Sequence, residues 1–167
     1  MARRFRGSET FRVDGKGRVS IPAAFRRVIE ASDPDWRDGL KPNIVIVYGD
    51  HRQDWLEVYT VTAIDEIDLQ IEDMQRGSEE RRMLEDLMHG KSLETQIDED
   101  GRLVLPQKLR EKIGLKDEAF FIAQGDYFKI WKPATYEAHE RRRAAKVADK
   151  YPEDFDPRSL LPPRSRG

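Results

Sequence analysis

The sequence predicts a mainly β fold with helices, of the α+β class, assembled from two copies of one small unit. Three observations support this prediction: a motif that occurs twice, a strand pattern followed by a hairpin pattern in each copy, and a helical segment after each hairpin. A unit of roughly fifty residues buries too little apolar surface to fold by itself. We therefore expect the two copies to interlock into one pseudo-symmetric β-barrel.

The repeated motif is D-x-x-G-R-φ-x-φ-P-x-x-φ-R, in which φ is an apolar residue. It is VDGKGRVSIPAAFR at residues 13–26 and IDEDGRLVLPQKLR at residues 97–110. Five identical residues recur 84 positions apart: Asp14, Gly17, Arg18, Pro22 and Arg26 correspond to Asp98, Gly101, Arg102, Pro106 and Arg110. A match of this quality over so short a window indicates a duplication.

Each copy is expected to begin with a strand and a tight turn. The strand covers residues 10–13 in the first copy and 95–98 in the second. The Asp of the motif can accept a hydrogen bond from the backbone two residues on, and its Gly can adopt the positive φ that such a turn requires. The expected structural residues of the two turns are Asp14, Gly17, Asp98 and Gly101.

A second strand, a short helix, a hairpin and a longer helical segment complete each copy. The Pro of the motif suits the first turn of a helix, where its missing N–H would have no partner anyway. Ile64, Ile67 and Ile71 lie at helical spacing and are expected to pack either between protomers or inside one chain. The expected organisation is a first domain at 5–60, a helical connector at 61–92, a second domain at 93–135, a C-terminal helix at 136–150 and a flexible tail at 151–167.

The net charge of −2 conceals a strong segregation of charge along the chain. Residues 1–27 contain eight Lys and Arg against two acids, whereas residues 28–100 contain seven against twenty. This segregation predicts one cationic face with acidic surfaces elsewhere, although an ordinary solvated surface is the alternative. With no Cys, no long apolar run and no secretory signal, we expect a cytoplasmic protein without membrane contact.

The first turn has three interpretations: a phosphate-binding loop, a plain hairpin turn and a contact with nucleic acid. Lys16 between two glycines suggests a phosphate loop, but the spacing G-x-x-x-x-G-K-S/T is absent. The second copy has Glu99 and Asp100 at the corresponding positions, and these would repel a phosphate. A plain hairpin turn explains the conserved pattern of Asp and Gly within the chain, but it does not explain the arginines.

Arg18 and Arg102 directly follow the turn glycines, so we expect them to project from the mouth of each turn. A guanidinium group suits both phosphates and guanine edges, whereas pairing with the motif Asp would make the arginine structural, and both roles can coexist. The candidate DNA-binding residues are Arg6, Arg12, Lys16, Arg18, Arg26, Arg102 and Arg110. Because Glu99 and Asp100 make the second turn acidic, its contact should be the weaker one.

Catalysis has no support in the sequence. The three histidines, His51, His89 and His139, lack the spacing of a metal site, and no nucleophile motif such as G-x-S-x-G is present. The many carboxylates of residues 65–100 fit a solvated helical face. We expect no enzyme activity, no catalytic or metal-binding residue and no cofactor. The competing class is a non-DNA interaction module or a small barrel enzyme.

The segments RGSETFRVDGKGRVSIPAAFR and IDEDGRLVLPQKLREKIGL resemble the paired D-x-x-x-R elements of the MraZ family. This resemblance covers the chain from residue 5 to about 140. It implies two tandem SpoVT/AbrB-type domains of the swapped-hairpin superfamily. It also implies a DNA-binding transcriptional regulator that acts, as a ring-shaped homo-oligomer at the nucleoid, on short repeated promoter boxes upstream of its own gene in the division and cell-wall cluster.

The resemblance also implies roles for particular residues. The D-x-x-x-R motif of the family falls on Asp14 with Arg18 and on Asp98 with Arg102, and its N-terminal arginine falls on Arg6. The chain departs from the family pattern by the N-terminal extension MARR and by an insertion at residues 32–42. With the acidic second turn, this insertion argues against equal participation of the two domains.

Overall fold

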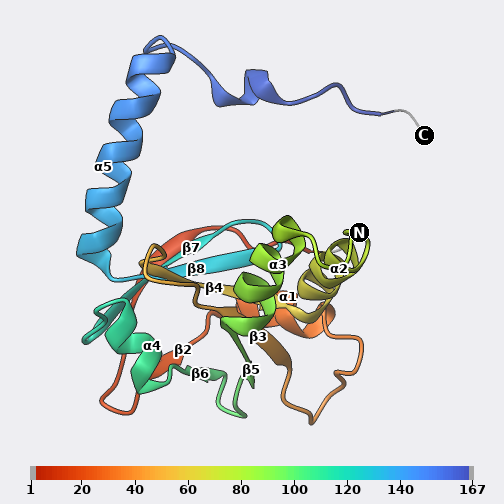
Figure 1. Cartoon of the computed structure of the whole chain (residues 1–167). Coiled ribbons are helices and arrows are strands. Elements are labelled where there is room, and N and C mark those ends of the chain that lie inside the picture. Colours follow the sequence, from red (N-terminus) through yellow and green to blue (C-terminus); the bar gives the residue numbers. More distant parts are fainter. Residues whose placement is uncertain (1–2, 166–167) are drawn as a thin grey trace.

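The computed structural model describes residues 3–165 and has the predicted α+β fold, with antiparallel strand pairing (Figure 1). The strands are β1 (Ser8–Arg12), β2 (Arg18–Ser20), β3 (Asn43–Val47), β4 (Trp55–Thr60), β5 (Ser92–Gln96), β6 (Arg102–Val104), β7 (Glu118–Ala123) and β8 (Tyr127–Trp131). The helices are α1 (Ala23–Ala31), α2 (Val61–Glu72), α3 (Glu79–Glu85), α4 (Gln107–Lys112) and α5 (Pro133–Lys150). A π-helical turn at Asp86–Gly90 follows α3, and a 3₁₀ turn at Pro157–Leu160 lies in the tail.

Six strands form one antiparallel sheet in the order β1-β7-β8-β4-β3-β5, and β2 pairs with β6 in a separate two-stranded ribbon. The pairing crosses the two halves of the chain, since β1 pairs with β7 and β5 pairs with β3. The expected closed barrel is not formed in the described residues. β1 and β5 remain the two edges of the large sheet, because the chain turns away after each of them to form the ribbon.

One apolar core joins the two halves of the chain. Val19 of β2 and Leu103 of β6 are completely buried, together with Ile46, Phe121 and Phe128 from the large sheet. The ribbon therefore rests on the core through one of its faces. Side chains alternate between the two faces of a strand, so the other face of the ribbon is directed outward. Segments of the expected domains 5–60 and 93–135 meet in this single core.

α2 covers the other face of the large sheet, at β3 and β4. The Thr60 hydroxyl begins this helix by accepting a hydrogen bond from the Ala63 N–H at 3.1 Å, which is the usual role of an N-cap residue. Ile64 and Ile71 are buried and Ile67 is half-buried in the cluster beneath the helix. The structure thus places these three isoleucines in packing within the chain, one of the two alternatives that the sequence left open.

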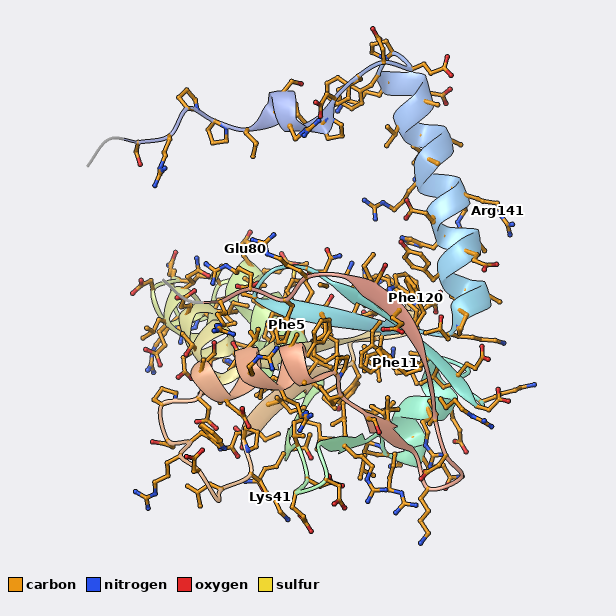
Figure 2. The ribbon with its side chains drawn as sticks, turned by 180° about the vertical axis from the view of Figure 1, so that it is seen from behind. Phe5, Phe11, Lys41, Glu80, Phe120 and Arg141 are labelled. Carbon is orange, nitrogen blue, oxygen red and sulfur yellow. The ribbon has the colours of Figure 1, made fainter. Side chains whose placement is uncertain are left out.

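α5 is attached to the sheet by its first two turns only. The ring centroids of Tyr136 and Phe120 are 4.4 Å apart, and those of His139 and Trp131 are 5.0 Å apart. Residues 141–150 are all exposed, and the helix rises away from the sheet in both views (Figures 1 and 2). No helix in residues 3–165 is long and apolar enough to cross a membrane. The end of the expected tail, residues 166–167, and Ala2 of the N-terminal extension lie outside the described residues.

Candidate nucleic-acid interface

The first turn, residues 14–17, is closed by its aspartate. The Gly17 N–H donates to the Asp14 carbonyl at 2.9 Å, and Asp14 Oδ1 accepts from the N–H groups of Lys16 at 3.0 Å and Arg18 at 2.9 Å. Gly17 has a φ of 82°, which an L side chain rarely adopts. Hydrogen bonds from the Arg18 backbone and side chain, and from the Lys16 backbone, lower the pKa of Asp14 to about 2. The predicted turn residues therefore have the expected positions.

The second turn, residues 98–101, repeats this arrangement. Asp98 Oδ1 accepts from the N–H groups of Asp100 and Arg102, both at 2.9 Å, and the Gly101 N–H donates to the Asp98 carbonyl at 3.0 Å. Gly101 has a φ of 75°. Burial raises the pKa of Asp98, but the hydrogen bonds outweigh it, so that the pKa remains below its ordinary value. The two turns share one backbone design.

The ribbon of β2 and β6 joins the two turns. Arg18 lies opposite Val104 in the antiparallel register, and Arg102 lies opposite Ser20. Each strand of the antiparallel ribbon has three residues, so the two turns lie at its opposite ends, roughly 10 Å apart. We call the residues 14–18 and 98–102, with the outward side of the ribbon, the turn face. In Figure 1 the loops of the turn face lie at the bottom of the molecule, at the end remote from α5 and the tail.

The two arginines of the turn face differ in their ion pairs. Arg18 Nε lies 2.6 Å from Asp14 Oδ2, and the two terminal nitrogens of Arg18 have no protein partner in the described residues. Arg102 Nη2 lies 3.0 Å from Asp100 Oδ2, and its Nε is 3.5 Å from Asp98 Oδ2. The Arg18 and Arg102 side chains are 34% and 32% exposed. Arg18 thus presents a free fork, whereas Arg102 is held by two carboxylates.

Arg26 and Arg110 lie behind the turns and each contacts the turn of the other motif copy. A Cβ on Gly101 would meet Arg26 Nη1 at 2.8 Å, and a Cβ on Gly17 would meet Arg110 Nε at 2.8 Å. Arg110 Nε also donates to the Leu105 carbonyl at 2.9 Å. These two candidates are half-buried supports of the turns. The only sequence signal for this role was that both belong to the repeated motif.

The remaining candidates are placed differently along the chain. Lys16 is exposed at the tip of the first turn, and Arg12 is exposed at the end of β1 that leads into it. Arg6 is exposed beside the short bridge between Phe5 and Gly125. An extended chain covers roughly 25 Å between residues 6 and 14, so Arg6 lies at the far end of β1 from the turn face. The structure groups Lys16 and Arg12 with Arg18, but not Arg6.

The insertion at residues 32–42 contacts the second turn. Lys41 Nζ lies 3.3 Å from Glu99 Oε2, and Lys41 is seen near the turn face in Figure 2. The loop is fixed at its base by the buried Asp33, whose Oδ2 accepts from the Asn43 N–H at 2.9 Å. The sequence does not indicate this contact, because Lys41 and Glu99 are far apart along the chain and belong to no common local pattern.

The turn face contains the chemistry of a nucleic-acid interface: cationic forks with fixed backbones on an outward ribbon, supported by a core. Comparisons with known proteins agree with this class. Residues 88–156 match the family model described as "MraZ protein, putative antitoxin-like". The Transcriptional regulator MraZ of Ruegeria pomeroyi is 60% identical over 161 residues, covering 96% of each chain.

More distant relatives bear the same name. The Transcriptional regulator MraZ of Cereibacter sphaeroides is 46% identical over 145 residues, covering 83% of this chain and 85% of the relative. That of Rickettsia akari is 34% identical over 136 residues, covering 81% and 85%. The fold is that of an α+β protein with two arginine-bearing turns on one ribbon. The chain belongs to the MraZ family of transcriptional regulators.

Proposed function

We propose that this chain is a sequence-specific DNA-binding regulator that binds tandem short promoter boxes upstream of the division and cell-wall gene cluster, including its own gene. The observation that carries this proposal is the free Arg18 fork on the rigid turn face, next to the exposed Lys16. Family membership supports the regulatory role. The proposed partner is double-stranded promoter DNA, bound at the nucleoid in the cytoplasm.

In the proposed mechanism the turn face enters the major groove, which is wide enough for a two-stranded β-ribbon. Arg18 donates from its two terminal nitrogens to a guanine edge, while Lys16 and Arg12 bind flanking phosphates. Arg102 makes a weaker contact because Asp98 and Asp100 already occupy its guanidinium. Arg6 and Arg26 are also proposed to lie nearer phosphates, with Arg6 at phosphates distant from the first turn, and Arg110 is kept as a DNA-binding candidate without an assigned contact.

The two turns act in the proposed mechanism as related half-units. We take the equal spacing of 84 residues between β1 and β5, and between β2 and β6, as support for a duplicated, pseudo-symmetric origin. A ring-shaped homo-oligomer would present several turn faces to tandem boxes. Once one protomer is bound, the next contacts become intramolecular, and the overall affinity rises without any new chemistry.

A mobility-shift titration tests the proposal. The full chain is titrated with its own upstream DNA and with scrambled DNA of the same length, at fixed moderate salt. We expect a shift only for the upstream DNA, and no shift for Arg18→Ala with an unchanged oligomeric mass. Arg76→Ala removes an exposed arginine between α2 and α3 and serves as the matched control, which should bind normally. Equal binding of both DNAs, or binding retained by Arg18→Ala, contradicts the proposal.

A further inference from the structure

The last turns of α5 and the tail after it form a segment with little contact to the rest of the protein. We call residues 141–161 the C-terminal arm. Its helical part, 141–150, is exposed at every residue and contains five Lys and Arg against one acid. Ten helical residues extend about 15 Å, and an isolated helix this short is marginal in water. The arm therefore gains stability if another surface covers it.

Apolar side chains on the C-terminal arm are exposed as well. Val147 is 52% exposed on the last turns of α5, and Leu160 is 63% exposed in the tail. Single exposed apolar residues are ordinary on a protein surface. Here Val147 lies on a helix that leaves the body of the molecule, among cationic residues such as Lys146 and Lys150, and Leu160 lies in the tail that follows this helix. The chemistry that complements this arm is an apolar groove with an acidic rim.

The structure contains a groove of that kind beside α3. Met83, Leu84 and Leu87 line a cavity of about 620 Å³, and Met83 is 63% exposed. Glu80 and Asp86 belong to the same lining. We call this surface the α3 groove. Asp50 is the third acid of this lining.

Two cations, Arg52 and Lys91, also line the α3 groove, so its three acids exceed its cations by one. Arg52 is paired with Asp50, whose Oδ2 lies 2.7 Å from Arg52 Nη2. Lys91 is half-buried at the end of the π-helical turn. The groove therefore combines exposed apolar side chains with a small excess of acids, and it complements the basic C-terminal arm with its exposed Val147 and Leu160.

We propose that the C-terminal arm of one protomer binds in the α3 groove of a second copy of this chain. The helical part of the arm, residues 141–150, rises away from the sheet, because Tyr136 and His139 hold only the first two turns of α5 (Figures 1 and 2), and we therefore assign it to a groove on another copy. Arm and groove are different surfaces, so the contact is head-to-tail, and repeated contacts of this type close into a ring when the rotation allows it.

This inference rests on the homo-oligomer of the proposed function but not on DNA binding. The absence of cysteine from the sequence allows a direct test by cross-linking. A Met83→Cys chain is mixed with a Val147→Cys chain and treated with a short bifunctional maleimide. We expect a product of twice the chain mass in up to about half of the protein, because in an equal mixture only half of the Val147→Cys arms meet a Met83→Cys groove. Both positions are more than half exposed, so folding should be preserved.

A matched control uses the opposite end of the molecule. Val104 is 46% exposed on the turn face, and Val104→Cys mixed with Val147→Cys should give at least tenfold less cross-linked product. Equal yields from the two mixtures would overturn the proposal. So would a Met83→Cys, Val147→Cys double variant that cross-links only within one chain, because that result assigns the groove to its own arm.

Charge reversal gives an independent measurement. Glu80→Lys with Asp86→Lys reverses the rim of the groove, and Lys146→Glu with Lys150→Glu reverses the arm. Light scattering should show that each pair of changes at least halves the oligomeric mass, and that all four together restore most of it. An unchanged mass in both reversed variants overturns the proposal. Because the turn face is untouched, loss of promoter binding by Arg18→Ala remains a separate test of the proposed function.

Discussion

The two turns of the turn face have the same backbone and opposite charge. In both, an aspartate accepts from two backbone N–H groups and a glycine with positive φ completes the turn. Between these fixed positions the first turn has Gly15 and Lys16, whereas the second has Glu99 and Asp100. The turn geometry thus depends on Asp and Gly alone, and the two residues between them set its electrostatic potential without changing the fold.

The difference changes what each arginine has available for a partner. Arg18 uses only Nε for its ion pair, at 2.6 Å from Asp14. Arg102 is within 3.5 Å of both Asp98 and Asp100. A phosphate or base edge that approaches Arg102 must compete with two carboxylates. Four changes to the protein test how far this difference between the two turns extends.

The largest effect on DNA binding is expected from removal of the arginines themselves, because the loss is repeated in each protomer that contacts DNA. A good bidentate contact to a base contributes about 1–3 kcal/mol, which is roughly 5- to 150-fold in affinity for each protomer. Arg18→Ala should lose this contribution in every protomer and with it promoter binding. Arg102→Ala should weaken binding about tenfold or less, as measured by titration at one salt concentration. Equal losses would show that the acidic turn does not weaken its arginine.

The turn glycines should differ in their effect on stability. In Gly17→Ala the new Cβ would clash with the Leu105 carbonyl oxygen at a positive φ, and we expect a loss of about 2–4 kcal/mol in the free energy of unfolding. In Gly101→Ala the nearest atoms belong to the flexible Arg26 side chain, so we expect about 1–2 kcal/mol.

Urea denaturation monitored by Trp fluorescence measures both losses. Gly15→Ala is the control, because a Cβ at this position would have no neighbour within 4 Å and the backbone has no positive φ. The free energy of unfolding should change by no more than about 0.5 kcal/mol. A Gly101→Ala loss equal to or larger than that of Gly17→Ala would contradict the predicted order.

Exchange of the two central residues should transfer the charge of one turn to the other. Glu99→Gly with Asp100→Lys gives the second turn the sequence of the first, frees Arg102 from one carboxylate and adds a cation. We expect tighter promoter binding, with a slope of log K against log salt that is steeper by about 0.9 for each added phosphate contact. The reverse change, Gly15→Glu with Lys16→Asp, should flatten the slope. No change in either variant would show that these positions do not face DNA.

The smallest effect concerns the pH dependence of the first turn. The pKa of Asp14 is lowered from 3.8 to about 2, chiefly by hydrogen bonds from Arg18. Its contribution to stability is therefore fully present above pH 3.8 and is lost as the pH falls through 2. Carbon-detected NMR titration should give a carboxyl midpoint near pH 2, and Asp14→Asn should remove the corresponding part of the acid destabilisation. A midpoint at 3.8 or above would exclude the ion pair with Arg18.

The sequence was sufficient to predict the fold class and the two turns. The motif is local, and its aspartate and glycine have specific backbone roles that recur in both copies. The predicted β-barrel is not found in the described residues. The period of the apolar residues shows which face of a strand is buried, but not which other strand it pairs with. The edge positions of β1 and β5 depend on that pairing.

The site was predicted in part. Lys16, Arg12 and Arg18 lie together because they are close in sequence around one turn. The supporting role of Arg26 and the ion pair of Lys41 with Glu99 involve contacts between distant segments; the repeated motif marks Arg26 without showing what it contacts, and the sequence contains no signal for the ion pair. Charge counts along the chain likewise predicted a cationic first segment, but not that β1 separates Arg6 from the turn.

The crossed positions of Arg26 and Arg110 have a consequence for how the protein can vary. Each turn is supported by a side chain from the opposite half of the chain, so neither half contains a fully supported turn of its own. A fragment that contains one motif would expose an unsupported turn, and a substitution in one helix would alter recognition by the other half. The two halves are therefore constrained to change together, even though their central turn residues have diverged in charge.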